Sequence, residues 1–446
     1  MARLVVIGGG AAGMSAASAA RRVDPALDVV VCEAGGFAAY GMCGIPYYLG
    51  GVVERAEDLL AYPPEVFRER RRIDLRLHTR VTALDAASRR VALDDGDVLD
   101  YDALVVASGA DPVRPPIPGL DHERVVTVRS LDEAVGLRRL LDGGGVHRAL
   151  VVGAGYIGLE AAEALVDAGC DVEVVEALPR VLPTVDPPAA ELVAAELSRH
   201  TVLRLGSGLD AVRGRAGGLT AVVDGVGLDV DLVVAAVGVR PASGLLCAAG
   251  ARCLPNGAVV VDEEMRTSLA NVYAAGDCVA LPHLVLGEPA WVPLGPAANK
   301  TGRVAGTVAA GGSSSFAGIV GTAVVKVFDL EVARTGLGLD EARAAGFDAV
   351  ATDVDSRSRA KYYPGTTPVH VRVVHSPGGR LLGAQLVGRE GAAKRVDVFA
   401  AALHARMSVD DVAALDLSYA PPFAPVYDPV LVAAGRAAMS EQGVVG

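Results

Sequence analysis

Leu4-Val5-Val6-Ile7-Gly8-Gly9-Gly10-Ala11-Ala12-Gly13 decides the fold, because a short apolar run leads directly into the glycine spacing Gly8-x-Gly10-x-x-Gly13. The residues that follow predict an Ala-rich helix to about Arg22 and a second strand over 28–32 that ends at Glu33. In such a unit the glycines let the backbone approach a pyrophosphate, the helix N-terminus faces it, and the acid binds ribose hydroxyls. The stretch therefore predicts a dinucleotide-binding βαβ unit that contacts its ligand through Gly8, Gly10, Ala12, Gly13 and Glu33.

The same pattern returns in the middle of the chain. A strand over 149–153 leads into Gly153-x-Gly155-x-x-Gly158, a helix through Ala168, and a strand over 171–175 that ends at Glu176. Each unit is followed at a matched distance by a buried strand, which closes on Ala107-Ser108-Gly109 in one case and on Gly238 in the other. The sequence thus predicts a duplicated module that binds two dinucleotides.

Residues 245–315 are predicted to complete the first domain, and the residues after them are predicted to form a third one. A strand ends in Gly276-Asp277, whose carboxylate can accept ribityl or ribose hydroxyls, and Pro296-Ala297-Ala298 opens an Ala/Gly helix with its N–H groups free. After a Gly/Ser linker at 311–315, strands at 322–328, 369–374 and 381–387 and a helix over 391–406 predict a separate α+β region for dimerisation. The predicted class is α/β, with two Rossmann-like domains and a C-terminal α+β dimerisation domain. The predicted divisions are 1–115 and 245–315 for the first domain, 116–244 for the second and 316–446 for the third.

Composition excludes several classes of protein. The 446 residues carry a formal charge of −12, which leaves no basic patch for nucleic acid and disfavours anionic membranes. The longest apolar runs have strand length, short of the ~20 residues of a membrane helix. Glycines 8–10 interrupt the N-terminal apolar run, so we expect no signal peptide and a cytoplasmic protein. Six scattered cysteines without Cys-x-x-Cys, and eight histidines without ligand spacing, predict neither structural disulfides nor a metal site.

The segment Tyr40-Gly41-Met42-Cys43-Gly44-Ile45-Pro46-Tyr47-Tyr48 places one cysteine between glycines just after the first βαβ unit. It could be a Gly/Pro turn with an incidental buried cysteine. A thiol there would also be within reach of a flavin. Because the thiolate is the nucleophile, the second interpretation predicts a lowered pKa for Cys43, with help from a helix N-terminus and a tyrosine hydroxyl.

These motifs together resemble the two-dinucleotide flavoprotein disulfide reductases over nearly the whole chain, and the Cys43 segment resembles their single-cysteine branch. That branch contains coenzyme A-disulfide reductases, NADH oxidases and NADH peroxidases. The resemblance implies FAD in the first domain, NADH (or NADPH) in the second, coenzyme A as substrate or mixed disulfide, and a homodimer. It implies FAD contacts at Gly8, Gly10, Ala12, Gly13, Glu33, Ala107, Ser108, Gly109, Gly276, Asp277, Pro296, Ala297 and Ala298. It implies NAD(P)H contacts at Gly153, Gly155, Tyr156, Ile157, Gly158, Glu160, Glu176 and Gly238.

Further residues are assigned by the same resemblance. Tyr419 and one of Tyr362 and Tyr363 would reach the partner subunit's cysteine site, although tyrosines of an α+β domain also serve as ordinary packing. Arg21 and Arg22 match a basic pair that helps to hold coenzyme A phosphates, and the alternative is a solvated helix end. Ala39 and Met42 replace a serine and an asparagine of the coenzyme A-disulfide reductases, so the substrate stays open. We assign Cys43, Tyr419, Tyr362 and Tyr363 to catalysis and Arg21, Arg22 and Met42 to the substrate.

Three functions remain open on the sequence. The first is NADH-dependent reduction of coenzyme A disulfide or of a related disulfide, persulfide or polysulfide. The second is an NADH oxidase that reduces oxygen at the flavin and Cys43, although the first glycine loop lacks the histidine of the oxidases and peroxidases. The third is an electron-transfer or redox-sensing flavoprotein. Glu176, with no basic residue directly after it, predicts a preference for NADH, which Arg180 could weaken.

Overall fold

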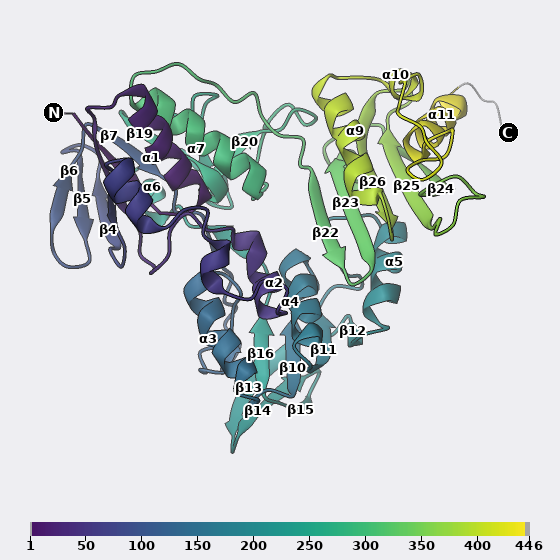
Figure 1. Ribbon diagram of the computed structural model, residues 1–446, viewed down its shortest axis with the longest axis horizontal. Helices are drawn as coiled ribbons and strands as arrows, with labels where there is room; N and C mark the ends of the chain where they lie inside the picture. Colours follow the sequence, from purple (N-terminus) through teal and green to yellow (C-terminus); the bar gives the residue numbers. More distant parts are fainter. Residues whose placement is uncertain (1, 442–446) are drawn as a thin grey trace.

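The computed structural model describes residues 2–441, and Figure 1 shows three lobes in it. The first lobe holds a five-stranded parallel sheet in the order β19-β7-β1-β2-β3. Its strands are β1 (Arg3–Ile7), β2 (Asp28–Cys32), β3 (Asp74–Arg76), β7 (Ala103–Val106) and β19 (Val272–Ala274). Because β19 comes from a segment far along the chain, this lobe is built from two separate stretches of sequence.

Helices α1 (Ala11–Val23) and α7 (Gly295–Ala309) lie side by side in the first lobe (Figure 1). Glycines permit this close approach. A Cβ atom at Gly302 would lie 2.1 Å from the carbonyl oxygen of Ala12, and one at Gly306 would lie 2.0 Å from that of Ala16. The small residues of both helices are therefore a packing requirement, and they hold the start of α7 close to the first glycine turn.

The second lobe repeats the design with the order β12-β11-β10-β16-β9. Its parallel strands are β9 (Val125–Val126), β10 (Arg148–Val152), β11 (Asp171–Glu176), β12 (Val202–Leu205) and β16 (Leu232–Ala235). Its helices are α3 (Leu131–Asp142), α4 (Tyr156–Asp167) and α5 (Pro187–Leu197). In both lobes the strand before the glycine turn is central, and an antiparallel three-stranded sheet is inserted before the fourth strand of the unit. These sheets are β4 (Val81–Asp85), β5 (Arg90–Leu93) and β6 (Val98–Asp100), and β13 (Leu209–Arg215), β14 (Gly218–Val223) and β15 (Val226–Val230). The predicted duplication of the module is confirmed.

Two short strands, β8 (Ala110–Pro112) and β17 (Val239–Pro241), connect these lobes. They pair with each other in antiparallel fashion, β8 after β7 of the first lobe and β17 after β16 of the second. The remaining elements of residues 40–310 are short. They are α2 (Ile45–Leu49), α6 (Gly244–Ala248), β18 (Val259–Val260), β20 (Val279–Pro282), β21 (Pro289–Ala290), a π-helical turn at Val66–Arg70 and 3-10 turns at Met42–Gly44, Ala56–Leu59 and Gly276–Cys278.

The third lobe is an antiparallel sheet in the order β22-β23-β26-β25-β24. Its strands are β22 (Ala323–Val327), β23 (Leu330–Gly336), β24 (Val350–Arg357), β25 (Pro368–His375) and β26 (Leu381–Gly388), and its helices are α8 (Leu339–Ala344), α9 (Ala392–His404), α10 (Val409–Ala413) and α11 (Pro429–Glu441). Helix α9 packs on β23 and β26, and α11 packs on β24 and β25. The predicted fold class is confirmed, whereas the exact domain divisions stay a prediction.

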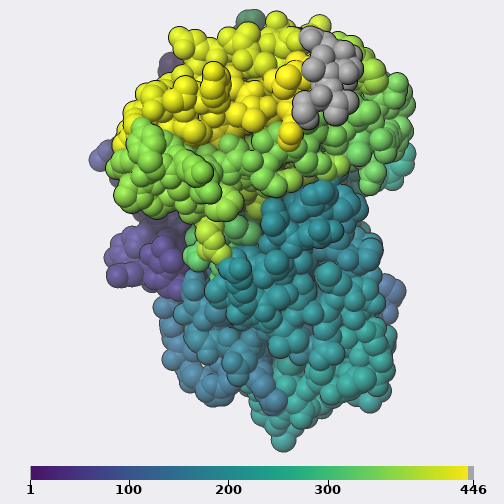
Figure 2. Space-filling view, turned by 90° about the vertical axis from the view of Figure 1, so that its right-hand side faces the viewer, coloured from purple at the N-terminus to yellow at the C-terminus, as the bar shows by residue number. Residues whose placement is uncertain are grey.

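Buried polar contacts join the second and third lobes. Arg372 of β25 donates a hydrogen bond to the carboxylate of Asp186 at 2.8 Å, and both side chains are buried. The backbone N–H of Asp186 donates to the side chain of Gln385 at 2.8 Å. Figure 2 shows the second lobe, in teal, packed directly beneath the green and yellow third lobe. Breaking one partner of such a buried pair is costly, so the two lobes are held in a defined arrangement.

One sequence-based expectation is wrong. Cys247 and Cys253 form a disulfide, although we expected no structural disulfide. The short helix α6 and the turn at Gly250, whose φ is +91°, bring the two Cα atoms to 6.4 Å. That Cα–Cα separation is normal for a disulfide. Two cysteines six residues apart match no sequence motif that predicts a disulfide. Within residues 2–441, no helix is long and apolar enough to cross a membrane.

Candidate active site

The first glycine turn leaves an open space at the N-terminus of α1. Gly8 has a φ of +99°, and a Cβ atom there would lie 2.4 Å from the carbonyl oxygen of Ala107. A Cβ atom at Gly13 would lie 1.8 Å from the carbonyl oxygen of Gly8, so this position also excludes a side chain. At Gly10, in contrast, a Cβ atom would meet nothing within 4 Å. Free space beside the first N–H groups of a 13-residue helix fits the pyrophosphate of a dinucleotide.

The second glycine turn has the same geometry. Gly153 has a φ of +101°, a Cβ atom at Gly158 would lie 1.9 Å from the carbonyl oxygen of Gly153, and one at Gly155 would meet nothing within 4 Å. The acids that end the second strands are equivalent as well. Glu33 accepts a hydrogen bond from the N–H of Gly9 at 2.6 Å, and Glu176 accepts one from the N–H of Ala154 at 2.7 Å. Both carboxylates are thus fixed at the edge of a glycine turn, where a ribose would lie.

The turn Ala107-Ser108-Gly109 follows β7 and lies beside the first glycine turn. Ser108 donates a hydrogen bond to the carbonyl of Ala242 at 2.6 Å, and the N–H of Ala242 donates to the carbonyl of Gly109 at 3.0 Å. Gly238, at the equivalent place in the second module, has a φ of +107°, and a Cβ atom there would meet nothing within 4 Å.

Asp277 lies in the turn between β19 and β20. Burial raises the pKa of its carboxyl group, and the guanidinium of Arg129 opposes that rise. The indole N–H of Trp291 donates to the backbone carbonyl of Asp277 at 2.7 Å, and the N–H of Gly276 donates to Thr301 of α7 at 3.1 Å. These contacts fix the Gly276–Asp277 turn against the start of α7, where Pro296, Ala297 and the buried Ala298 form the first turn of the helix.

Cys43 lies in the 3-10 turn Met42–Gly44, which runs directly into α2. Its side chain is exposed, whereas Cys32, Cys170 and Cys278 are buried. A Cβ atom built on Gly295 would lie 4.0 Å from the Cys43 Sγ atom, so the sulfur faces the first residue of α7. The predicted proximity of Cys43 to a helix N-terminus is thus present in the structure. The partial positive charge there favours an anion at this position.

The pKa of Cys43 differs from the sequence-based expectation. Burial of its immediate surroundings raises the pKa of the thiol, and the carboxylates of Glu160 and Asp277 raise it further. The Cys43 backbone N–H opposes this rise. The expected lowering of the pKa is therefore wrong for the protein chain by itself, because desolvation, and then two carboxylates that lie far away in sequence, disfavour the thiolate.

Helix α4 carries the side chains predicted to lie on the nicotinamide side. Tyr156 and Ile157 occupy its first two positions, and the hydroxyl of Tyr156 accepts a hydrogen bond from Thr184 at 3.3 Å. Burial and the neighbouring carboxylate of Glu163 raise the pKa of Glu160 to about 7. Glu160 also lines a cavity of about 160 Å³ with Tyr47, and Glu163 forms an ion pair with Lys326 from β22 at the edge of that cavity. Lys326 was not identified from the sequence, because β22 shows no motif.

A cavity of about 390 Å³ is lined at one side by Tyr40 and Gly41, which precede Cys43 in the sequence by three and two residues. Arginines from three distant segments line it: Arg22 at the end of α1, Arg71 after the π-helical turn, and Arg303 in α7. Its wall also contains Ala11, Met14, Ser15, Ser18, Ala39, Ala61, Tyr62, Phe67 and Asn299. The guanidinium of Arg71 lies 4.5 Å from the centroid of the Tyr62 ring. Sequence reasoning missed Arg71, Tyr62 and Arg303, and the only signal was the basic run Arg70-Arg71-Arg72.

The other predicted substrate residues have different positions. Arg21 lies outside this cavity: its guanidinium donates to the backbone carbonyls of Pro25, Arg71 and Arg72. It thus supports the segment that carries Arg71. Met42 contacts the guanidinium of Arg129 through its sulfur, and Arg129 also donates to the carbonyl of Ala110 at 2.6 Å.

The C-terminal tyrosines lie on the surface of the third lobe. Tyr362 is 75% exposed and Tyr419 is 47% exposed. A hydrogen bond to Tyr362 is the main cause that raises the pKa of Tyr419, so the two side chains lie together. Tyr363 is partly buried, with the guanidinium of Arg359 5.9 Å from its ring centroid. The structure therefore pairs Tyr362, rather than Tyr363, with Tyr419. Within residues 2–441, no group of three or more histidine, cysteine, aspartate or glutamate side chains is arranged to hold a metal ion.

Comparison with known proteins gives the family. Residues 2–302 match the pyridine nucleotide-disulphide oxidoreductase family, and residues 322–429 match the dimerisation domain of that family. The chain is 40% identical over 97% of its length, and 97% of the relative's, to a protein of Pyrococcus abyssi named NAD(P)H sulfur oxidoreductase (CoA-dependent). It is 30% identical over 95% of its length, and 96% of the relative's, to the coenzyme A disulfide reductase of Staphylococcus haemolyticus. The solved structure of an NAD-dependent persulfide reductase from A. fulgidus matches with a TM-score of 0.95 at 39% identity, covering 99% of this chain and 84% of that one.

The names of these relatives cover several activities. They include reduction of disulfides, sulfur and persulfides, and further relatives are named NADH oxidase. The family and its members support FAD and a nicotinamide dinucleotide as the cofactors, which fits the two glycine turns described above. From the duplicated nucleotide modules, the C-terminal sheet and these matches together, the chain belongs to the pyridine nucleotide-disulphide oxidoreductase family.

Proposed function

We propose that this protein uses NADH to reduce a coenzyme A-linked disulfide or persulfide at Cys43. The observation that carries the proposal is the cavity at Tyr40 and Gly41, which three arginines line although the chain has a net charge of −12. Cations gathered from three segments at one place favour an anionic ligand. Gly41 in the cavity wall precedes the exposed Cys43 by two residues, and we propose that a ligand held in the cavity extends from there to the thiol.

The chemistry of the cavity wall suits coenzyme A. Guanidinium groups bind phosphates through charge-assisted hydrogen bonds, and Arg22, Arg71 and Arg303 would share the phosphates of the nucleotide end. Tyr62, which is exposed, offers aromatic surface for an adenine ring. Arg71 is held in place by a hydrogen bond to Ser18 at 2.8 Å. The side with Tyr40 and Gly41 would then direct the sulfur end of the ligand towards Cys43.

The reaction we propose at Cys43 is thiol–disulfide exchange. The Cys43 thiolate attacks one sulfur of the disulfide, a Cys43–coenzyme A mixed disulfide forms, and the first coenzyme A leaves as a thiolate that takes up a proton. Two electrons then cleave the mixed disulfide, which releases the second coenzyme A and restores the Cys43 thiolate. FAD, when bound, supplies these two electrons after it has received them from the nicotinamide cofactor. With a persulfide substrate the same exchange releases hydrosulfide.

Other residues of the chain would support this step. The N-terminus of α7, which faces the Cys43 sulfur through Gly295, favours the thiolate. Glu160, with its pKa raised to about 7, can hold a proton at neutral pH close to the thiol. The hydrogen-bonded pair of Tyr362 and Tyr419 is exposed on the dimerisation lobe, and we propose that it meets the cysteine site of a second copy. There a phenol hydroxyl would donate to the leaving thiolate.

A comparison of wild type with Cys43→Ser tests the proposal. We expect wild type to oxidise NADH with coenzyme A disulfide and Cys43→Ser to lose that activity while it keeps FAD. We also expect mass spectrometry of the non-reduced wild type to find coenzyme A attached to Cys43 after incubation with the disulfide. Comparing coenzyme A disulfide with coenzyme A persulfide then identifies the better substrate.

Other outcomes would assign the protein differently. Full activity of Cys43→Ser with coenzyme A disulfide would remove the proposed role of the thiol. Fast oxygen consumption with an unmodified or sulfenylated Cys43 would instead indicate an NADH oxidase. Slow turnover of oxygen and of every small disulfide would indicate an electron-transfer or redox-sensing flavoprotein.

A further inference from the structure

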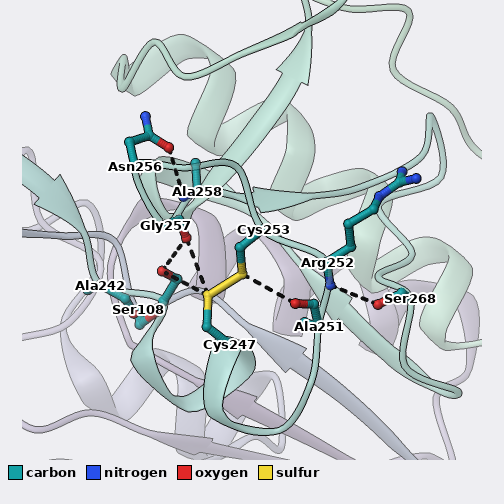
Figure 3. The surroundings of a disulfide bond; sticks show 11 residues. Ser108, Ala242, Cys247, Ala251, Arg252, Cys253, Asn256, Gly257, Ala258 and Ser268 are labelled. Carbon is teal, nitrogen blue, oxygen red and sulfur yellow. Dashed lines mark hydrogen bonds between the residues drawn. A yellow bond between two sulfur atoms is a disulfide. The ribbon is translucent and has the colours of Figure 1, made fainter.

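The Cys247–Cys253 disulfide lies outside the Cys43 site and has no role in the reaction proposed above. Figure 3 shows it between α6 and the following loop. Both cysteines are partly exposed, whereas Cys32, Cys170 and Cys278 are buried. Apart from Cys43, they are therefore the only cysteines in residues 2–441 that are not buried. Because exchange requires access to one of the two sulfurs, this partial exposure makes the bond the candidate for attack by a thiol of low molecular weight.

The disulfide binds α6 to the loop after it. Leu246 of α6 is fully buried in the core of the first lobe, which anchors the helix from beneath. The hydroxyl of Ser243 donates to the carbonyl of Gly257 at 2.5 Å, and the Cys247 sulfur lies 3.5 Å from the same carbonyl oxygen (Figure 3). Gly257 has a φ of +90°, so this loop depends on a turn that few other residues adopt. The bond to Cys253 keeps the loop against the beginning of α6.

Ala242, which directly precedes Ser243 and α6, forms two hydrogen bonds with the Ala107–Gly109 turn. Ala242 accepts the hydrogen bond of the Ser108 hydroxyl at 2.6 Å and donates its own N–H to Gly109 at 3.0 Å. Figure 3 draws Ser108 and Ala242 on the same side of the disulfide as Cys247. A continuous set of contacts thus leads from the disulfide through Ser243 and Ala242 to the turn that the family resemblance assigns to FAD.

We propose that Cys247–Cys253 is a second redox site: thiols of low molecular weight open this disulfide, and only its closed form holds the Ala107–Gly109 turn in the shape that retains FAD. The proposal goes beyond the proposed function and rests on the contact of FAD with this turn that the family resemblance implies. Among the thiols that qualify are those that the reaction at Cys43 would itself release. The redox state of the thiol pool would then set how firmly the protein holds its flavin.

The exchange is balanced by the thiols themselves. One thiolate attacks a sulfur of the disulfide, which breaks the S–S bond, forms a mixed disulfide with one cysteine and leaves the other as a thiolate. A second thiol then attacks the mixed disulfide, so that two thiols become one small disulfide and both cysteines are reduced. Two electrons and two protons pass from the thiols to the protein, and the reverse reaction closes the bond.

The experiment uses the FAD-bound protein with Cys43→Ser, which removes the exposed catalytic thiol and any turnover at it. The protein is equilibrated without oxygen in buffers with varied ratios of glutathione to glutathione disulfide. Alkylation and peptide mapping then give the fraction of open Cys247–Cys253, and the fluorescence of released FAD gives its dissociation rate. We expect opening as a single two-electron transition and roughly tenfold faster release of FAD from the open form, the effect of about one lost hydrogen bond.

Several results would overturn the proposal. They are free thiols at both positions even at the most oxidising glutathione ratio, a disulfide that stays closed at every glutathione ratio, and equal rates of FAD release from the two forms. As a control, Cys247→Ser/Cys253→Ser in the same background should release FAD at the fast rate whatever the glutathione ratio. If that variant does not fold, the two redox forms of the parent protein still decide the question. A failure of disulfide reduction at Cys43 would leave these measurements unchanged, because the variant used lacks that reaction.

Discussion

Glu160 of helix α4 acts on Cys43 of the 3-10 turn across the site. Burial is the main cause that raises the pKa of the Cys43 thiol, and the carboxylate of Glu160 is the next. Glu160 itself has a pKa raised to about 7 by burial and by Glu163. The ionised carboxylate of Glu160 therefore disfavours the thiolate of Cys43, and this coupling links the charge of α4 to the reactivity of the thiol.

This coupling predicts the effect of Glu160→Gln. Removal of the carboxylate takes away a like charge, so the pKa of Cys43 should fall and its thiolate should form at a lower pH. The measurement is the rate of alkylation of Cys43 by iodoacetamide as a function of pH, with the labelled peptide identified by mass spectrometry. The matched control is Glu191→Gln, because Glu191 is an exposed carboxylate of α5 that is not among the groups shifting the pKa of Cys43 or Glu160. An alkylation profile that Glu160→Gln leaves in place would contradict the coupling.

The arginine cavity predicts a loss of binding rather than of chemistry. Arg22→Gln should raise the KM for coenzyme A disulfide about tenfold, as expected for one lost charge-assisted contact to a phosphate, with kcat little changed. Pantethine, which lacks the nucleotide, should be reduced equally well by the variant and by wild type. Arg55→Gln is the control, because Arg55 is exposed, forms an ion pair with Asp58 and does not line the cavity. Equal losses with both substrates would show that Arg22 is not a phosphate contact.

The position of Glu176 predicts the nicotinamide cofactor. Its carboxylate is fixed by the N–H groups of Ala154 at 2.7 Å and Leu178 at 2.8 Å, so it cannot turn away from a ribose 2′-phosphate. NADH should therefore have the higher kcat/KM, and Glu176→Ala should narrow the ratio of NADH to NADPH at least tenfold. Steady-state kinetics with both cofactors gives the answer. A wild type that prefers NADPH would refute the assignment.

His283 predicts a loss of stability in acid. The side chain is 4% exposed, and its Nδ1 atom accepts hydrogen bonds from the N–H groups of Val285 and Leu286 at 3.3 Å. Burial and then Arg334 lower its pKa from 6.5 to about 4, while Glu341 opposes them. Between pH 6.5 and 4 the unfolded chain therefore binds a proton that the folded one does not. Stability should fall by about 2 kcal/mol from pH 7 to pH 5.

The variant His283→Asn isolates this contribution. Its amide oxygen can accept the same backbone hydrogen bonds without titrating, so the variant should lack that part of the pH dependence. Denaturant midpoints of both proteins at pH 7 and pH 5 provide the measurement. Parallel pH profiles for wild type and variant would show that His283 is not the titrating group.

Local sequence patterns predicted most of the fold. The Gly8 and Gly153 turns are recognisable locally, because Gly13 and Gly158 exclude a side chain through the carbonyls of Gly8 and Gly153 within the same turn. The candidate active site was harder to predict from the sequence, because its residues come from distant segments that meet only in the folded chain. Arg71 and Arg303 are separated by more than half the chain yet line one cavity, and no spacing relates Glu160 to Cys43. The Cys247–Cys253 bond escaped prediction because a six-residue spacing has no characteristic motif.

Because the first lobe is built from two separate stretches of sequence, it cannot complete its fold until late in synthesis on the ribosome. Strand β19 completes the first sheet, and α7 covers α1, yet both lie after the entire second module in the sequence. The second module, from β9 to β16, is continuous and has all its strands once residue 235 has been synthesised. We therefore expect it to fold on the ribosome first, while residues 3–106 wait for 272–309 with their apolar surfaces uncovered. The flavin module is thus the last of the two to close, and it is the one that needs protection during synthesis.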